Sequence, residues 1–207
     1  METSLNSALL NSSASYQTII NKDGIAIYID SLISEEKSKL FLLQLSKNIQ
    51  WKNDESVIFG KHFITRRKTA WYGDRPFCYT YSKIKRAALP WTNELLEIKN
   101  IVEKNVSRKF NSCLLNFYHD GDDGMGWHSD NETELKKNGV IASVSLGSMR
   151  KFSFKHKKTK EKIHLTLGNG SLLTMKDKLQ EHWVHQLPKS KKIREPRINL
   201  TFRTICS

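Results

Sequence analysis

Apolar and polar positions alternate in several short runs along the second half of the chain, which is typical of β-strands. The runs span residues 140–146, 151–156, 163–167, 171–175, 183–187 and 197–203. Turns separate them, among them the glycine-containing turn at 168–170. Short strands at this density predict a mainly β protein whose core is a double-sheet jelly roll, also called a double-stranded β-helix.

Helical patterns are confined to the first half of the chain. Ser34 is a typical N-cap, and the acidic Glu35 and Glu36 follow it before a run of apolar positions that ends at Ile49. A second helix is predicted from about Thr92, with apolar residues at helical spacing. Residues 24–29 precede both helices and alternate as a strand. We expect both helices to flank the sheet.

Chain length and composition predict one domain over residues 16–207, with the jelly-roll core at about 110–205. Residues 1–15 are rich in Ser and Asn and are expected to form a loose tail, not a signal peptide. No apolar run is long enough to cross a membrane. Three scattered cysteines suit a reducing intracellular compartment. We expect a monomer in the cytoplasm (nucleoid) of a bacterium or in the nucleus of a eukaryote.

The net charge of +13 is concentrated in three basic clusters, at residues 66–68, 155–160 and 189–194. A cluster of lysines is usually a solvated surface, but three in one basic chain favour a polyanionic partner, and nucleic acid is the commonest. The candidate contacts in the first two clusters are Arg66, Arg67, Lys68, Lys155, Lys157 and Lys158.

The segment from Asn116 to Asp130 carries the candidate metal chemistry. A glycine-containing loop follows the strand-like Asn116-Phe117-Tyr118 and leads to His128 and Asp130, whose spacing of two places both side chains on one side of an extended segment. His185 would supply a third ligand. His182 would point to the opposite face if its strand is extended. Two histidines and one carboxylate form the facial triad that holds Fe(II) with open coordination positions.

The last strand has a polar face directly after these ligands. Ile198, Leu200 and Phe202 share one face, and the opposite face carries Arg197, Asn199, Thr201 and Arg203. A guanidinium binds a carboxylate through two parallel hydrogen bonds. The face therefore suits a dicarboxylate co-substrate that chelates the metal at its other end.

Together, His128-x-Asp130, His185 and Arg197-x-Asn199-x-Thr201-x-Arg203 resemble the AlkB family of Fe(II)/2-oxoglutarate dioxygenases, in particular its DNA-repair branch. Asn116-x-Tyr118 and residues 141–147 and 170–173 match as well, and the likeness spans about residues 57–204. The resemblance implies Fe(II), 2-oxoglutarate and O2 as cofactor and co-substrates. It assigns 2-oxoglutarate binding to Asn116, Tyr118, Arg197, Asn199, Thr201 and Arg203.

The resemblance also implies oxidative demethylation of 1-methyladenine and 3-methylcytosine in DNA, with release of formaldehyde, succinate and CO2. Residues of about 55–90 would form a nucleotide-recognition lid. In that lid Phe59 would wedge into the space left by the flipped base, beside Gly60 and Lys61. The base pocket would be lined by Tyr72, Tyr79, Tyr81 and Glu132; packing of these aromatic residues on the domain is the alternative.

Other functions remain open on the sequence alone. The same core could demethylate RNA or oxidise a protein or lipid, and a binding module without turnover is a further alternative. A hydrolytic zinc site would leave Arg197 and Arg203 unexplained. We expect double- or single-stranded DNA as the partner, with RNA as a second option and no membrane.

Overall fold

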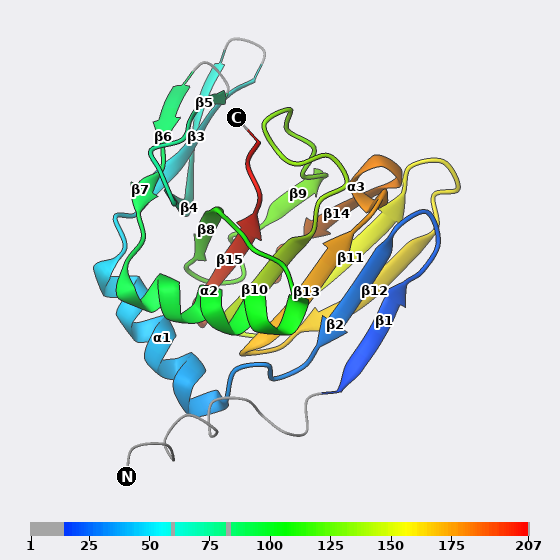
Figure 1. The fold of residues 1–207 in the computed structure, drawn as a ribbon, viewed down its shortest axis with the longest axis horizontal. Coiled ribbons are helices and arrows are strands. Elements are labelled where there is room, and N and C mark those ends of the chain that lie inside the picture. Colours follow the sequence, from blue (N-terminus) through cyan, green and yellow to red (C-terminus); the bar gives the residue numbers. More distant parts are fainter. Residues whose placement is uncertain (1–14, 59–60, 82–83, 207) are drawn as a thin grey trace.

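The structure, a computed structural model, describes residues 15–58, 61–81 and 84–206, and describes side chains outside residues 56–63 and 78–86. Two stacked β-sheets form its centre (Figure 1). In spatial order, the large sheet contains β1 (Tyr16–Ile20), β2 (Ile25–Ile29), β13 (Ser171–Lys176), β10 (Ile141–Gly147), β15 (Arg197–Arg203), β8 (Ser112–Tyr118), β4 (Lys61–Gly73) and β3 (Lys52–Ile58). The short β7 (Leu89–Pro90) pairs with β4 in parallel.

The small sheet contains, in spatial order, β12 (Lys162–Leu167), β11 (Arg150–His156), β14 (Trp183–Leu187) and β9 (Met125–His128). A separate hairpin pairs β5 (Cys78–Tyr81) with β6 (Ile84–Ala87). The predicted mainly β, jelly-roll architecture is confirmed, and the strands predicted in the second half agree with the observed ones to within a residue at each end. β1 was not predicted.

One core cluster lies between the two sheets. Ile141 and Leu173 of the large sheet pack there with Phe154 and Trp183 of the small sheet. These residues all lie on strands and are buried. The apolar side chains on the inward faces of the alternating strands therefore hold the two sheets together.

A second core cluster lies between the large sheet and the helices α1 (Glu35–Asn48) and α2 (Asn93–Val106). Phe41 of α1 and Ile98 of α2 are fully buried there, and both helices lie along one side of the large sheet (Figure 1). Side chains cap both N-termini: Lys37 N donates to Ser34 Oγ at 3.3 Å, and Leu95 N donates to Thr92 Oγ1 at 3.4 Å.

The expectation that helices are confined to the first half of the chain is wrong, because α3 (Leu179–His182) precedes β14. His182 is therefore the last residue of a helical turn and not part of an extended strand. No helix within the described part of the chain is long and apolar enough to cross a membrane.

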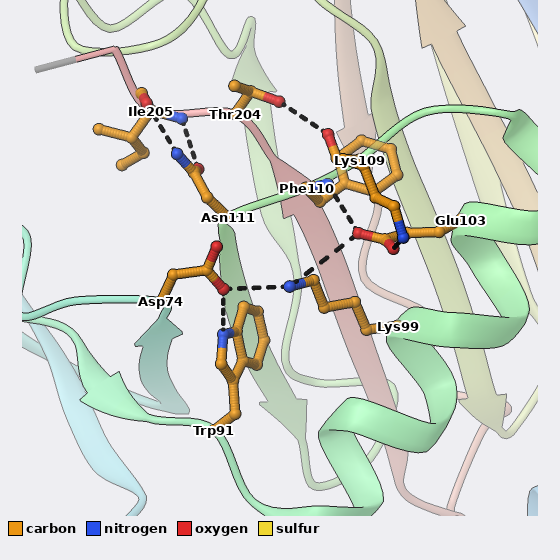
Figure 2. Close-up of polar contacts among 9 residues, drawn as sticks. All are labelled: Asp74, Trp91, Lys99, Glu103, Lys109, Phe110, Asn111, Thr204 and Ile205. Atoms are coloured by element: carbon orange, nitrogen blue, oxygen red, sulfur yellow. Dashed lines mark hydrogen bonds and ion pairs between the residues drawn. The ribbon is translucent and has the colours of Figure 1, made fainter.

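A polar network fixes the end of β4 to α2 (Figure 2). The Asp74 carboxylate accepts hydrogen bonds from Trp91 Nε1 at 2.6 Å and from Lys99 Nζ at 3.0 Å. Lys99 lies between Asp74 and the buried Glu103, and Glu103 also accepts from the backbone N of Phe110 at 2.9 Å. The base of the β3–β4 hairpin is thus attached to a helix that packs on the core.

Asn111 extends this network to the end of the chain. Its side-chain amide donates to the carbonyl of Ile205 at 2.9 Å and accepts from the backbone N of Ile205 at 2.8 Å. Its own carbonyl accepts from the backbone N of Asp74 at 2.9 Å. Figure 2 shows both hydrogen bonds between Asn111 and Ile205. The segment after β15 and the start of β8 therefore hold the same end of β4.

Candidate metal and co-substrate site

His128 and His185 come from neighbouring strands. β9 and β14 are antiparallel, and their register places His128 directly opposite His185, with ring centroids 4.3 Å apart. Asp130 follows on the loop after β9. One potential ligand atom from each of these three residues lies within 4.8 Å of the others. The structure therefore brings together the three residues that the sequence assigned to the metal.

Hydrogen bonds outside the triad orient two of its members. His128 Nδ1 lies 2.8 Å from the carbonyl oxygen of Gly126, and because a carbonyl only accepts, Nδ1 carries the proton and Nε2 is left as the donor atom for a metal. The backbone N of Asp130 donates to Gln180 Oε1 at 3.0 Å. Gln180 belongs to α3, the helix that the sequence did not predict, so its role was missed.

Charge and burial at the triad favour the protonation states of Asp130 and His185 that coordinate a metal. Burial would raise the pKa of Asp130, but Arg203, His185 and His128 outweigh it and hold that pKa below its usual range. Burial lowers the pKa of His185 to about 4. At neutral pH the site therefore offers a carboxylate and a neutral imidazole.

Arg197 faces the same cavity with donors to spare. Its Nη2 donates to Ser145 Oγ at 2.9 Å, while Nε and Nη1 are buried and have no hydrogen-bond partner among the described residues. Burial lowers its pKa to about 10, so the guanidinium stays charged at neutral pH beside the ring of Tyr118, 5.3 Å away. A buried cation with free donors calls for an anion, and a carboxylate fits its fork geometry.

Asn199, Thr201 and Asn116 also line the cavity. Asn199 Nδ2 donates to Ser143 Oγ at 2.8 Å and to the carbonyl of Val144 at 3.0 Å, and Thr201 Oγ1 donates to Asn199 Oδ1 at 3.2 Å. These bonds fix the two side chains of β15 against β10. Asn116 lies opposite Asn199 in the sheet register, on β8.

Arg203 lies next to the candidate metal ligand Asp130. Its Nη1 is 3.2 Å from Glu132 Oε1 and 3.7 Å from Asp130 Oδ1. The two arginines of β15 are therefore placed differently: one has an acidic partner next to the triad, and the other is held by Ser145 and Tyr118. Arg197 lines the cavity, whereas Arg203 lines a neighbouring pocket together with Asp130 and Glu132.

The cavity has a volume of about 260 Å³ and lies between the two sheets. Apolar side chains from the small sheet and its connections, Met125, Phe152 and Leu187, form one side. The polar residues of β8, β15 and β10 form the other. The remaining lining includes the triad and residues that the sequence did not assign to the site, namely Asp54, Thr69, Leu114, Ser129, Asn131, Ser143 and Met175.

Two sequence assignments are wrong. Tyr72 is not a wall of the base pocket, because it is buried in the core under α1 and α2, where its hydroxyl accepts from the backbone N of Gln50 at 3.2 Å. Arg67 is not a surface contact for DNA: it is buried, bonds to Asp54 and Asn116, and lines the cavity. Lys157 is half-buried and donates to the carbonyl of Gln180 at 2.8 Å, and its role as a DNA contact stays a prediction.

Other assigned residues are untested. Phe59 and Gly60 lie outside the described residues, and so do the side chains of Lys61, Tyr79 and Tyr81. Lys68 is half-buried and Lys158 is exposed. Arg66 is exposed and bonds to Asp120 at 2.9 Å, and Lys155 Nζ lies 4.4 Å from the ring centroid of Trp127. The DNA-contact roles of these residues, and the domain and lid boundaries, stay predictions.

Residues 25–203 match the 2OG-Fe(II) oxygenase superfamily. The chain belongs to this superfamily. It is 36% identical over 197 residues to human DNA oxidative demethylase ALKBH2, an alignment that covers 90% of this chain and 76% of that one. It is 40% identical over 174 residues to mouse alpha-ketoglutarate-dependent dioxygenase alkB homolog 3, covering 79% of this chain and 60% of that one. The AlkB resemblance deduced from the motifs is therefore confirmed.

The chain spans about 60% of the length of its alkB homolog 3 relatives. Among solved structures, the one titled "The structure of OsALKBH1" aligns with a TM-score of 0.64 at 16% identity, covering 92% of this chain and 100% of that one. That likeness supports the fold alone. Superfamily membership implies Fe(II), 2-oxoglutarate and O2. The residues present fit these groups. The triad offers the metal ligands, and Arg197 offers a guanidinium whose Nε and Nη1 have no hydrogen-bond partner among the described residues.

Proposed function

We propose that this chain is an Fe(II)/2-oxoglutarate-dependent demethylase that removes N-linked methyl groups from 1-methyladenine and 3-methylcytosine in DNA. The observation that carries the proposal is a single cavity lined by the His128-Asp130-His185 triad, by Arg197 and by the acidic Glu132. Two buried donor atoms of Arg197 have no hydrogen-bond partner among the described residues. The relatives named as DNA oxidative demethylases support it. The products would be the unmodified base, formaldehyde, succinate and CO2.

Fe(II) with 2-oxoglutarate and O2 supplies the oxidising power when bound. The protein's own residues bind and orient. His128, Asp130 and His185 would hold the metal. Arg197 would bind the distal carboxylate of 2-oxoglutarate through Nε and Nη1, which have no hydrogen-bond partner among the described residues. Asn116 and Tyr118 hydrogen-bond beside it, and Arg203 contacts the co-substrate near the end next to Asp130. Apolar residues of the small sheet, such as Phe152 and Leu187, exclude water from the side of the cavity that faces Arg197.

Glu132 is the residue that suits a methylated base. Its Oε1 pairs with Arg203, whereas its Oε2 is buried without a hydrogen-bond partner among the described residues. Methylation at N1 of adenine or N3 of cytosine leaves a positive charge and blocks pairing, so such a base leaves the stack at low cost. A buried carboxylate oxygen with spare acceptor capacity would favour that cation and its exocyclic amine.

The test is anaerobic reconstitution with Fe(II) and 2-oxoglutarate, followed by air and methylated oligonucleotides as single-stranded DNA, duplex DNA and RNA. Repair of DNA with equal amounts of succinate and formaldehyde is the expected result. Asp130→Ala should abolish succinate formation and retain salt-sensitive DNA binding, which depends on phosphate contacts. Succinate without repair of any oligonucleotide would overturn the proposed substrate. A preference for RNA would replace DNA with RNA in the proposal.

The remaining expectations are part of the same proposal. The enzyme would act as a monomer in a reducing intracellular compartment, in the nucleoid or the nucleus, and Phe59 would act as the wedge in duplex DNA. A protein or lipid substrate is less consistent with the net charge of +13. Equal loss of single-strand and duplex repair in Phe59→Ala would remove the wedge role.

A further inference from the structure

The small sheet has an unusual charge pattern. Its four strands are fully described, and not one contains an Asp or Glu, whereas β11 and β12 together carry Arg150, Lys151, Lys155 and Lys162. One face of this sheet lines the cavity and the core between the sheets. The opposite face, here called the outer face, is directed away from the large sheet.

Lysines gather on the outer face. Phe152 and Phe154 point to the cavity and the core, so the alternating Lys151 and Lys155 of β11 point outward. The register places Lys155 directly opposite Lys162 of β12. Cross-strand partners share a face, and like charges directly opposite each other are destabilising. Among the described residues none of the three lysines forms an ion pair that would offset this repulsion.

An aromatic ring lies beside these lysines. On β9 and β14, Met125 pairs with Leu187 and His128 pairs with His185, and both pairs face inward. Two residues of β9 therefore lie between these pairs where β14 has only one. Such a bulge places Trp127 on the outer face. Lys155 Nζ lies 4.4 Å from the centroid of its indole ring, and Trp127 stays half-exposed. The contact joins β11 to the edge strand β9 across β14.

We propose that the outer face of the small sheet binds a single-stranded nucleic-acid segment, with phosphates on Lys151, Lys155 and Lys162 and one base stacked on Trp127. Lysines neutralise phosphates, and an aromatic face stacks any base, which is the combination that single strands require. The inference rests on the proposed function for the class of its partner. It adds a surface outside the base pocket.

The position of β9 relates this surface to the site. β9 is the edge strand of the small sheet, and its consecutive residues Trp127 and His128 lie on opposite faces. A nucleic-acid strand whose flipped base enters the cavity would cross this edge of the sheet to reach Trp127. The surface therefore holds the nucleotides that continue beyond the modified one.

The experiment measures binding of an unmodified, fluorescently labelled single-stranded DNA to the full chain without added metal, over a range of salt concentrations. The test variant is Lys151→Ala/Lys162→Ala. The control is Lys47→Ala/Lys104→Ala, which removes the same charge from exposed positions of α1 and α2. In the test variant alone, the slope of log K against log salt should become shallower by about 1.4, at about 0.7 for each phosphate contact.

Trp127 has its own pair of variants. Trp127→Ala should weaken binding of the single strand about tenfold, and Trp127→Phe, which keeps an aromatic face, should retain most of it. Circular dichroism and thermal unfolding of each variant establish that it is folded. Trp127→Phe keeps the test decisive if Trp127→Ala does not fold.

The outcomes separate this inference from the proposed function. If the slope of log K against log salt is the same in the test and control variants, the proposed binding surface is wrong, whatever the wild-type enzyme repairs. Competition by polyglutamate as strong as by single-stranded DNA would also overturn it, because the face would then accept any polyanion. Loss of binding in the test variant of a protein that forms no succinate would support the surface and contradict the function.

Discussion

Arg67 donates a hydrogen bond from Nη1 to the amide oxygen of Asn116, so a residue of the β3–β4 hairpin holds a residue of the candidate co-substrate cavity. Its Nη2 bonds to Asp54 on the other strand of that hairpin. The side chains of Arg67 and Asp54 are 8% and 14% exposed. The pair fixes which way the Asn116 amide points, because its oxygen is occupied and its NH2 group is left for the co-substrate.

Removing Arg67 should therefore affect both stability and 2-oxoglutarate binding. We expect Arg67→Gln to destabilise the fold by about 3 kcal/mol, since it removes the buried positive charge that pairs with the Asp54 carboxylate. Asp54→Asn/Arg67→Gln should cost less than Arg67→Gln alone, because no charge remains buried. Urea unfolding gives the stability, and anaerobic titration of the Mn(II)-loaded protein gives 2-oxoglutarate affinity, which should fall several-fold in both variants.

The neighbouring arginine is the matched control. Arg66 pairs with Asp120 at the surface, with side chains 58% and 23% exposed. Arg66→Gln should change the free energy of unfolding very little, because solvent screens this exposed ion pair, and it should leave 2-oxoglutarate affinity unchanged. Equal effects of the two substitutions would contradict the positioning role of Arg67.

Gln180 should contribute to metal binding without touching the metal. Its Oε1 accepts the hydrogen bond from the backbone N of Asp130, and partners of this kind typically affect metal affinity by about 10–100-fold. We expect Gln180→Ala to weaken Mn(II) binding about tenfold while the melting temperature changes little. Glu181→Gln, on the same helical turn, is the control, and an identical loss of affinity there would show that α3 acts only as a whole.

Tyr72 should behave as a core residue. Its hydroxyl accepts one hydrogen bond from the backbone N of Gln50, and its ring is buried with α1 and α2. Tyr72→Phe should cost about 1 kcal/mol of unfolding free energy and leave KM for a methylated oligonucleotide unchanged. A raised KM at unchanged stability would return Tyr72 to the base pocket.

Cys113 should remain unreactive while the protein is folded. Burial raises the pKa of its thiol far above the usual range, whereas Cys206 is exposed. In a Cys78→Ser background, a thiol reagent at mildly alkaline pH should modify Cys206 at once and Cys113 only at the rate of unfolding. Fast modification of both thiols would show that the β8 core opens readily.

The same shift has a defined sign for stability. The folded protein keeps the Cys113 proton at a pH where the unfolded chain loses it, so its contribution is complete below the ordinary thiol pKa and declines as pH rises above it. The decline approaches about 1.4 kcal/mol per pH unit. Unfolding curves at increasing alkaline pH should show it in the parent protein and not in Cys113→Ala.

The sequence predicted most of the metal and co-substrate residues because their relative positions depend on spacing within a single strand or loop. In a strand, residues two apart share a face, so Arg197, Asn199, Thr201 and Arg203 had to lie together wherever the strand was placed. The spacing of His128 and Asp130 follows the same rule. The family motifs then supplied His185 as the third ligand, which spacing alone could not.

Residues of β4 show where this reasoning failed. Arg67 and Thr69 point into the cavity, and Ala70 and Tyr72 point into the core under the helices. The sequence favoured the opposite, since an arginine suggests the surface and a tyrosine suggests a base pocket. Both faces of this strand are covered in the fold, so residue type could not tell which face meets which partner.

What the sequence determined by itself is most of the strands, the two capped helices and the candidate residues for Fe(II) and 2-oxoglutarate, because alternation and capping act over a few neighbouring residues. Tertiary structure alone decided that β9 pairs with β14, that α3 supplies Gln180 to the ligand loop, and that Arg67 reaches Asn116. These contacts join segments far apart in the chain. Their existence depends on how the sheets stack and on which buried charges find partners, and neither is encoded in a local pattern.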